Sequence, residues 1–215
     1  VQWALHRGRA ALFTPCGSGK TLMQCAWAAQ VPGQVLIVAP LAVTQQTIRE
    51  ARDKLAMVIP YVKTPAEMTS QICITNYDRL DAFYDIDITG IVLDESSILK
   101  AVTSKTRDAL IRHCTHIPFR LCCSATPAPN DIAEMANHAE FLGVMTRTAM
   151  LSTFFVHDDQ GWRLRGHARK AFFRWLASWS MAIRSPEDLG YDGSAFVLPP
   201  LRVNPTFLSI PWRAN

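Results

Sequence analysis

The residues whose types and spacing could do chemistry begin with a glycine-rich loop close to the first residue of the chain. An apolar run leads into TPCGSGKT, residues 14–21, and helix-forming residues follow at once. Glycines let backbone N–H groups turn inward on phosphate oxygens, and the start of a helix adds partial positive charge. Lys20 would reach the β and γ phosphates of a nucleotide, and the Thr21 hydroxyl would ligate Mg²⁺. The predicted phosphate-binding residues are Gly17, Ser18, Gly19, Lys20 and Thr21.

A glycine-rich turn with a surface lysine is the plain alternative for this loop. Thr14 stands where the usual phosphate-loop pattern has its first glycine. The GSGKT core, placed between a strand-like and a helix-like segment, still favours the phosphate-binding interpretation.

Two adjacent acids end another apolar run, about 75 residues after the loop. Buried carboxylates are costly unless a cation or a reacting water employs them. Asp94 would hold Mg²⁺ through a water, and Glu95 would orient and deprotonate an attacking water. Taken alone, two acids after a strand are more often a solvated loop, but behind a phosphate-binding loop they favour a catalytic pair. The predicted catalytic residues are Glu95, Asp94 and Lys20, and the predicted metal ligands are Thr21 and Asp94.

A third element, Ser124-Ala125-Thr126-Pro127, ends a further apolar run. By itself this sequence is typical of a turn or a helix cap. Its order behind the other two elements favours a functional role for Ser124 and Thr126.

Short apolar runs alternate with helix-length segments, which predicts an α/β fold with a mostly parallel sheet flanked by helices. In such sheets, ligands bind at the carboxyl ends of the strands, where the three elements above lie. The expected strands are 10–13, 35–39, 72–75, 88–93 and 120–124, and the expected helices are 20–30, 44–57, 77–84, 104–113 and 132–142.

The chain changes character near Thr146, where a segment rich in aromatic residues and arginine begins. A helix over 168–183 would place Phe172, Trp175, Leu176 and Trp179 on one face, which is ordinary core spacing. The basic residues Arg163, Arg165, Lys170 and Arg174 fit a nucleic-acid strip and a solvated face equally well. Leu201–Ile210 is a strand-like run after several prolines.

Composition sets few further limits. The chain has 215 residues, 49% of them hydrophobic and 19% charged, which predicts a globular protein rather than a disordered one. A net charge of +4 fits a nucleic-acid partner and many other enzymes alike. The six cysteines show no CxxC pair, so we expect reduced thiols and a cytoplasmic location, and no membrane helix or signal peptide is visible. His113, Cys114 and His116 lack a second ligand pair for zinc.

With these motifs in order, the chain resembles the first RecA-like lobe of superfamily 2 helicases, the DEAD/DEAH-like ATPases. GSGKT resembles motif I, Ala39-Pro40-Leu41 motif Ia, Asp94-Glu95-Ser96-Ser97 motif II and Ser124-Ala125-Thr126 motif III. The string from Asp94 to Lys105 is closest to the Swi/Snf-related branch, and the tail from Phe141 to Leu201 is similar to phage-encoded members.

The resemblance implies a P-loop NTPase lobe over residues 1–145, an aromatic and basic helical appendage over 146–200, and a linker or second lobe beginning at 201–215. It implies ATP and Mg²⁺ as cofactors, a coupling role for Ser124 and Thr126, and a second RecA-like lobe beyond Asn215 that supplies the arginine finger. It also implies a nucleic-acid partner, with DNA favoured over RNA and the choice between them left open, and no membrane. The expected nucleic-acid contacts are Pro40, Leu41, Thr75, Asn76 and Tyr77.

Three departures and two alternatives accompany this interpretation, and the first departure is that no second lobe is recognised within these 215 residues. Motif II ends in Ser96-Ser97, which leaves the subfamily open, and no glutamine upstream of the first strand is a secure adenine reader, Gln2 being a poor candidate. A small-molecule kinase would share the loop but gives no reason for the acid pair or for Ser124–Thr126. A non-catalytic scaffold lobe would not need Lys20, Thr21, Asp94 and Glu95 intact.

Overall fold

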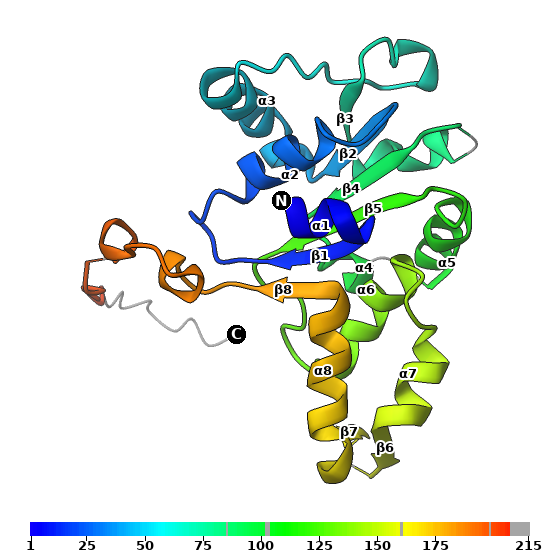
Figure 1. Ribbon diagram of the computed structural model, residues 1–215, viewed down its shortest axis with the longest axis vertical. Helices are drawn as coiled ribbons and strands as arrows, with labels where there is room; N and C mark the ends of the chain where they lie inside the picture. The colour runs from blue at the N-terminus through cyan, green and yellow to red at the C-terminus, as the bar shows by residue number, and fades with distance from the viewer. Residues whose placement is uncertain (85, 102–103, 160, 198, 207–215) are drawn as a thin grey trace, which may run out of the picture.

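A six-stranded parallel sheet forms the centre of the computed structural model, which describes residues 1–84, 86–101, 104–159, 161–197 and 199–206 (Figure 1). The strand order is β3-β2-β4-β5-β1-β8, and every pairing between neighbours is parallel. The strands are β1 (Arg9–Phe13), β2 (Val35–Ala39), β3 (Ile72–Asn76), β4 (Gly90–Asp94), β5 (Phe119–Ser124) and β8 (Ser180–Ala182). The expected α/β fold with a parallel sheet is confirmed.

The central strands are buried on both faces, which explains their continuous apolar sequences. Successive side chains point to opposite sides, so Ala10 and Leu12 of β1 join one core cluster while Ala11 and Phe13 join the other. Each face therefore needs its own layer of helices.

One face is covered by the helices α1 (Gln2–Arg7), α2 (Lys20–Ala28) and α3 (Leu41–Leu55). The other face packs against the 3₁₀ helix η2 (Tyr77–Phe83) and the helices α4 (Ile98–Ala101), α5 (Ser104–His113), α6 (Met135–Phe141) and α8 (Arg169–Trp179). Short 3₁₀ turns, η1 (Pro65–Glu67) and η3 (Ile132–Glu134), lie in the connections.

The aromatic segment forms a smaller cluster beside the sheet. Helix α7 (Arg147–Phe154) and the hairpin β6 (Phe155–Asp158) with β7 (Gly161–Leu164) precede the 3₁₀ turn η4 (Gly166–Ala168) and α8. Phe154, Phe155 and Phe172 pack edge to face at centroid distances of 5.4 and 5.6 Å. Phe172 and Trp179 of α8 are buried, as expected from their helical spacing. The turns η5 (Pro186–Leu189) and η6 (Ser194–Phe196) follow β8.

Two expected helices were wrong in type or extent. The segment expected as a helix over 77–84 is the 3₁₀ helix η2, because its three-residue period places Tyr77, Leu80 and Phe83 on the buried face. The helix expected over 168–183 ends at Trp179, and Ser180–Ala182 then pairs with Ala11–Phe13 of β1 as a sixth strand. The open edge of β1 determines this conformation, a signal that local propensity does not carry.

The remaining helix boundaries shifted by a few residues. Helix α3 begins at Leu41 rather than Thr44, directly after Pro40, and Ala56 ends it in a left-handed conformation (φ 54°). Helix α2 stops at Ala28 instead of Gln30, and the expected 132–142 helix is split into η3 and α6. Of the run expected at 201–210, residues 201–206 have no regular structure and 207–210 lie outside the described residues. Within the described residues, no helix is both long and apolar enough to cross a bilayer.

Candidate nucleotide site

The loop between β1 and α2 has the conformation that a phosphate cradle needs. Gly17 and Gly19 have φ values of 81° and 82°, in the left-handed region that side chains disfavour. A Cβ at either glycine would meet nothing within 4 Å, so backbone conformation, rather than lack of space, requires glycine there. The Gly19 carbonyl accepts the first helical bonds from Leu22 and Met23 at 3.0 Å, so α2 starts directly behind the loop.

Lys20 folds back across the mouth of this loop. Its Nζ donates to the Thr14 carbonyl oxygen at 3.0 Å, and the side chain is half-buried. A phosphate oxygen would be a stronger acceptor than a neutral carbonyl, because both partners would then be charged. Thr21, one residue into α2, is half-buried beside it.

Asp94 and Glu95 lie where β4 ends, and their surroundings differ. Asp94 is only 8% exposed, and burial raises its carboxyl pKa, opposed by the Gln24 amide, the Glu95 N–H and Lys20. The Gln24 side chain is itself completely buried, and its amide lowers the pKa of Asp94. A bound cation would reverse the effect of burial, because it stabilises the ionised carboxylate.

Glu95 has a left-handed backbone (φ 54°), which is uncommon for a residue with a side chain and costs about 1 to 3 kcal/mol. Its Oε1 accepts two hydrogen bonds, from Ser97 Oγ at 2.8 Å and from Ser124 Oγ at 2.9 Å. Ser124 is completely buried at the end of β5, and its hydroxyl also accepts from the Thr126 N–H at 3.1 Å. The structure therefore joins the two predicted motifs through one carboxylate oxygen.

These elements surround a polar pocket of about 360 Å³. The sequence-predicted residues Gly17, Gly19, Lys20, Thr21, Pro40, Asp94 and Glu95 line it. One wall comes from α3, whose residues Val43, Gln46, Thr47, Glu50 and Lys54 were not predicted to lie in the site. Their spacing of three or four residues puts them on one helix face, which is the signal that could have found them. The predicted residue Ser18 does not line this pocket, and its Oγ donates to the Pro15 carbonyl oxygen at 2.7 Å.

The donor set of the polar pocket fits a magnesium-bound nucleotide. Thr21 and Asp94 offer a hydroxyl and a carboxylate, the hard oxygen ligands that Mg²⁺ prefers, and phosphates complete such a sphere. No cluster of three His, Cys, Asp or Glu side chains that could hold a metal without a ligand occurs in the described part of the chain. At the group His113, Cys114 and His116, Cys114 is buried, and this burial raises its pKa to about 12.

The expected nucleic-acid contacts fall into two groups. Leu41 is 60% exposed at the start of α3, and Pro40 precedes it at the rim of the polar pocket. Thr75 and Asn76 are buried, and Thr75 Oγ1 donates to the Val62 carbonyl oxygen at 2.8 Å. Tyr77 lies behind motif II, with its hydroxyl donating to the Asp94 carbonyl oxygen at 2.8 Å, and burial raises its pKa. Leu41 therefore offers an exposed side chain, Thr75 and Asn76 are enclosed, and Tyr77 is half-buried on the wall of a separate pocket of about 400 Å³.

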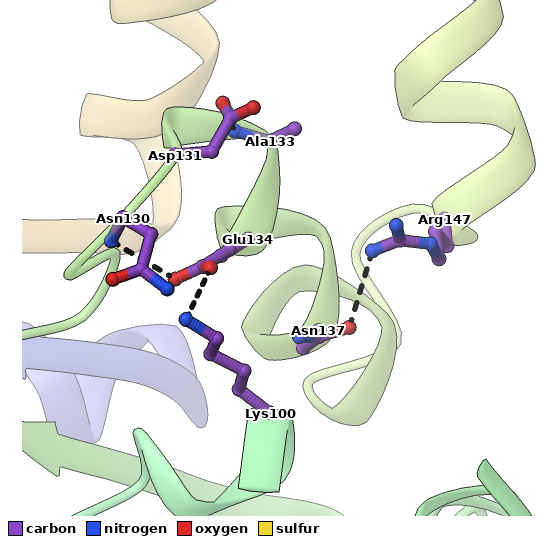
Figure 2. A network of polar contacts seen from close by, with 7 residues as sticks. All are labelled: Lys100, Asn130, Asp131, Ala133, Glu134, Asn137 and Arg147. Carbon is purple, nitrogen blue, oxygen red and sulfur yellow. Dashed lines mark hydrogen bonds and ion pairs between the residues drawn. The ribbon is translucent and has the colours of Figure 1, made fainter. Parts of the chain in front are cut away.

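Figure 2 shows a polar network that connects the segments after the two motifs. Lys100 of α4 forms an ion pair with Glu134 of η3 at 2.7 Å, and Glu134 also accepts from the Asn130 N–H at 3.5 Å. The Arg147 guanidinium donates to the Asn137 side-chain oxygen at 3.4 Å. Behind motif II, Ser96 Oγ lies 3.1 Å from Nε2 of the buried His138.

Comparison with solved structures identifies the fold. The Swi2/Snf2 ATPase core of Sulfolobus solfataricus, solved in complex with double-stranded DNA, matches with a TM-score of 0.70 at 16% identity over 85% of this chain. The Hef helicase domain of Pyrococcus furiosus gives 0.52 at 18% identity over 65%, and the UvsW helicase of bacteriophage T4 gives 0.51 at 16% identity over 66%. The chain thus has the α/β fold of a RecA-like lobe, similar to that of these three proteins.

The chain spans 42%, 34% and 56% of the lengths of these three proteins, respectively. No family model and no curated protein sequence matches it. The likeness is therefore one of fold.

Proposed function

We propose that this chain is the ATP-binding motor lobe of a nucleic-acid-dependent helicase or translocase. The observation that carries the proposal is the position of Glu95. Its carboxylate lines the same polar pocket as Lys20 and Thr21 and is held by the Ser124 hydroxyl at 2.9 Å. A phosphate-binding loop alone needs no such acid, whereas hydrolysis needs a base beside the terminal phosphate.

Each residue then has one task. Lys20 exchanges its Thr14 carbonyl partner for the β and γ phosphates, and the loop N–H groups bind the remaining oxygens. Thr21 and Asp94 would hold Mg²⁺, which neutralises charge on the transferring phosphoryl group when bound. Glu95 orients a water for in-line attack and accepts its proton.

The geometry disfavours a small-molecule kinase. A kinase requires no hydrogen bond between the acid that follows β4 and the end of β5. Here Ser124, at the end of β5, donates such a bond to Glu95. A scaffold lobe would have no reason to keep a strained φ of 54° at Glu95. The three solved structures compared above, to which this chain is similar in fold, are described as helicases or as a Swi2/Snf2 ATPase core.

DNA is the proposed nucleic-acid partner, because the structural neighbour with the highest of the three TM-scores was solved with double-stranded DNA. Contacts to phosphates would dominate, so we expect affinity to fall with salt and to depend little on sequence. The exposed start of α3 around Leu41 and the exposed Thr126 are the proposed contact points.

The test is a phosphate-release assay of the lobe joined to a second RecA-like lobe. Release is measured alone, with double-stranded DNA and with RNA, beside an assay for phosphate transfer to nucleosides. Stimulation by DNA supports the proposal. Transfer to a nucleoside would establish the kinase instead, and Mg-ATP binding without turnover under any condition would establish the scaffold.

A further inference from the structure

A second, apolar pocket of about 510 Å³ adjoins the phosphate loop. One wall is the loop and the first turns of α2, including Cys16, Gly17 and Met23. The other wall is the segment that follows β8, contributed by residues far away in sequence: Ile183, Arg184, Ser185, Pro186, Leu189, Tyr191 and Phe196. In Figure 1 this segment (orange) leaves the sheet at the same end as the loop (blue).

The segment after β8 has defined structure. The Ile183 N–H donates to the Phe13 carbonyl oxygen at 3.0 Å, which continues the pairing of β8 with β1. Asp188 accepts from the Arg184 N–H at 2.7 Å, and Tyr191 N–H closes the turn on the Pro186 carbonyl oxygen at 3.1 Å. The turn that carries these apolar side chains is therefore fixed after the carboxyl end of β8, beside the end of β1 where the phosphate loop begins.

These apolar side chains are open to solvent although they face a common space. Leu189 is 52% exposed, Tyr191 69% and Phe196 49%. Grouped exposed apolar side chains beside a polar site are typical of a ligand contact. Two aromatic rings beside an aliphatic wall suit a flat heterocycle that stacks on them.

The topology of the sheet specifies which ligand part would enter. Asp94 and Glu95 follow β4, which is separated from β1 by β5, whereas β8 lies on the other side of β1. A triphosphate with its terminal phosphate near Glu95 must extend its nucleoside in the opposite direction, toward β8. The two pockets share Cys16 and Gly17, so one ligand can occupy both.

We propose that residues 183–196 form the base-binding pocket of the nucleotide site, in which Tyr191 and Phe196 contact the base of the bound nucleoside triphosphate. This inference rests on the proposed nucleotide-binding function. It gives the base a set of contacts that does not involve Gln2. The Gln2 amide donates to Gln30 at 2.7 Å, beyond the far end of α2 and about 15 Å along the helix from Lys20.

Cys16 supplies a reporter that is independent of turnover. It is the one exposed thiol among the six cysteines, and it lines both pockets. Alkylation of Cys16 by a maleimide, read by mass spectrometry, is expected to be slowed by any ligand that fills the loop. Titrating a non-hydrolysable Mg-ATP analogue and Mg-tripolyphosphate separately distinguishes a contact with the base from a contact with phosphates alone.

The 215-residue chain is compared with Tyr191→Ala, Phe196→Ala, the double variant and Lys20→Ala. Leu201→Ala is the matched control, because Leu201 is 89% exposed on the same part of the chain and does not line the apolar pocket. For each aromatic variant we expect the protection midpoint of the ATP analogue to rise about tenfold, a typical loss for one stacked base. The tripolyphosphate midpoint should stay unchanged. Lys20→Ala should raise both midpoints, and Leu201→Ala neither.

The outcomes separate the two proposals. An unchanged midpoint for the ATP analogue in the double variant, with wild-type protection by tripolyphosphate, would overturn the base pocket and leave the phosphate loop standing. Protection by neither ligand would refute the phosphate loop and the base pocket together. As a second measurement, the ATP analogue but not tripolyphosphate should slow hydrogen exchange in the backbone of 183–196, and equal slowing by both would contradict the proposal.

Discussion

Replacing Ser124 by alanine should slow ATP hydrolysis and leave ATP binding unchanged. The substitution removes the hydroxyl that donates to Glu95 Oε1 at 2.9 Å, while Lys20, Thr21 and the loop keep their positions. Ser124 contributes no atom to the lining of the polar pocket. Its effect must therefore pass through Glu95, which makes it a positioning residue.

The magnitude follows from the contacts that remain. A hydrogen bond to a charged group contributes about 1.5 to 3 kcal/mol, which corresponds to a rate factor of roughly 10 to 150. Ser97 still holds the same oxygen at 2.8 Å, so we expect the lower end, about tenfold in kcat. Because both hydroxyls bind one oxygen, the double variant Ser97→Ala with Ser124→Ala should lose more than the sum of the single effects in free energy.

The assay is steady-state phosphate release with DNA, beside an equilibrium titration of Mg-ATP and a thermal unfolding curve. Ser178→Ala is the matched control, since that hydroxyl donates to the Trp175 carbonyl oxygen on the exposed side of α8, away from the site. A fall in ATP affinity equal to the fall in turnover would assign Ser124 a role in binding. Full turnover in the double variant would refute the reasoning about Glu95 altogether.

Four further outcomes are expected. Lys20→Ala should weaken Mg-ATP binding at least about tenfold, because it deletes the side-chain charge aimed at the phosphates; a titration with undiminished affinity in a folded variant would contradict this. Glu95→Gln should keep ATP binding and abolish phosphate release, because an amide cannot accept the proton of the attacking water, and wild-type turnover would place the general base elsewhere. The lobe alone should hydrolyse ATP barely and gain roughly 10³ to 10⁵ in rate with a second lobe, since no arginine lines the polar pocket in the described part of the chain; equal rates would show a complete enzyme. Burial lowers the pKa of His138 to about 4 from 6.5, so the unfolded chain binds the proton more tightly than the folded one. The free energy of unfolding should therefore fall by up to about 3 kcal/mol as the pH drops from 6.5 to 4. Denaturant titrations check this, and a His138→Gln variant whose free energy of unfolding keeps the same pH dependence would contradict it.

The grouping of the main residues of the candidate site could be predicted from the sequence because its geometry is local. A phosphate loop needs left-handed glycines within a few residues of a helix start, and the acid pair needs only a strand that ends beside it. The opposite holds for four residues of α3 that the sequence did not place in the site: Gln46, Thr47, Glu50 and Lys54. Polar residues along one face of a helix are typical of a solvated surface, and only the placement of α3 against the loop turns that face into a wall of the polar pocket.

Long-range pairing explains the other differences. Ser180–Ala182 follows a helix without a break, and only the open edge of β1, about 170 residues earlier, makes it a strand. Arg120 is fully buried in β5, where its guanidinium donates to the carbonyl oxygens of Phe141, Thr115 and Ile117. Burial lowers the pKa of Arg120 to about 10, and these carbonyl partners offset the cost of burying its charge. A sequence pattern shows neither the open edge of β1 nor the carbonyl oxygens that surround Arg120.

The same contacts suggest how an event at the surface would reach Glu95, the proposed catalytic base. Thr126 is exposed, its N–H donates to Ser124 Oγ, and that hydroxyl donates to Glu95, so a ligand that displaces Thr126 perturbs the carboxylate through two hydrogen bonds. The Lys100–Glu134 ion pair joins the segments after β4 and β5 (Figure 2). A shift between these segments would have to break that ion pair, whereas rotation of the Ser124 hydroxyl would break only its hydrogen bond to Glu95. If nucleic acid binds at Thr126 as proposed, it would act on Glu95 by redirecting one hydroxyl, so Ser124→Ala is expected to reduce stimulation by DNA more than the basal rate.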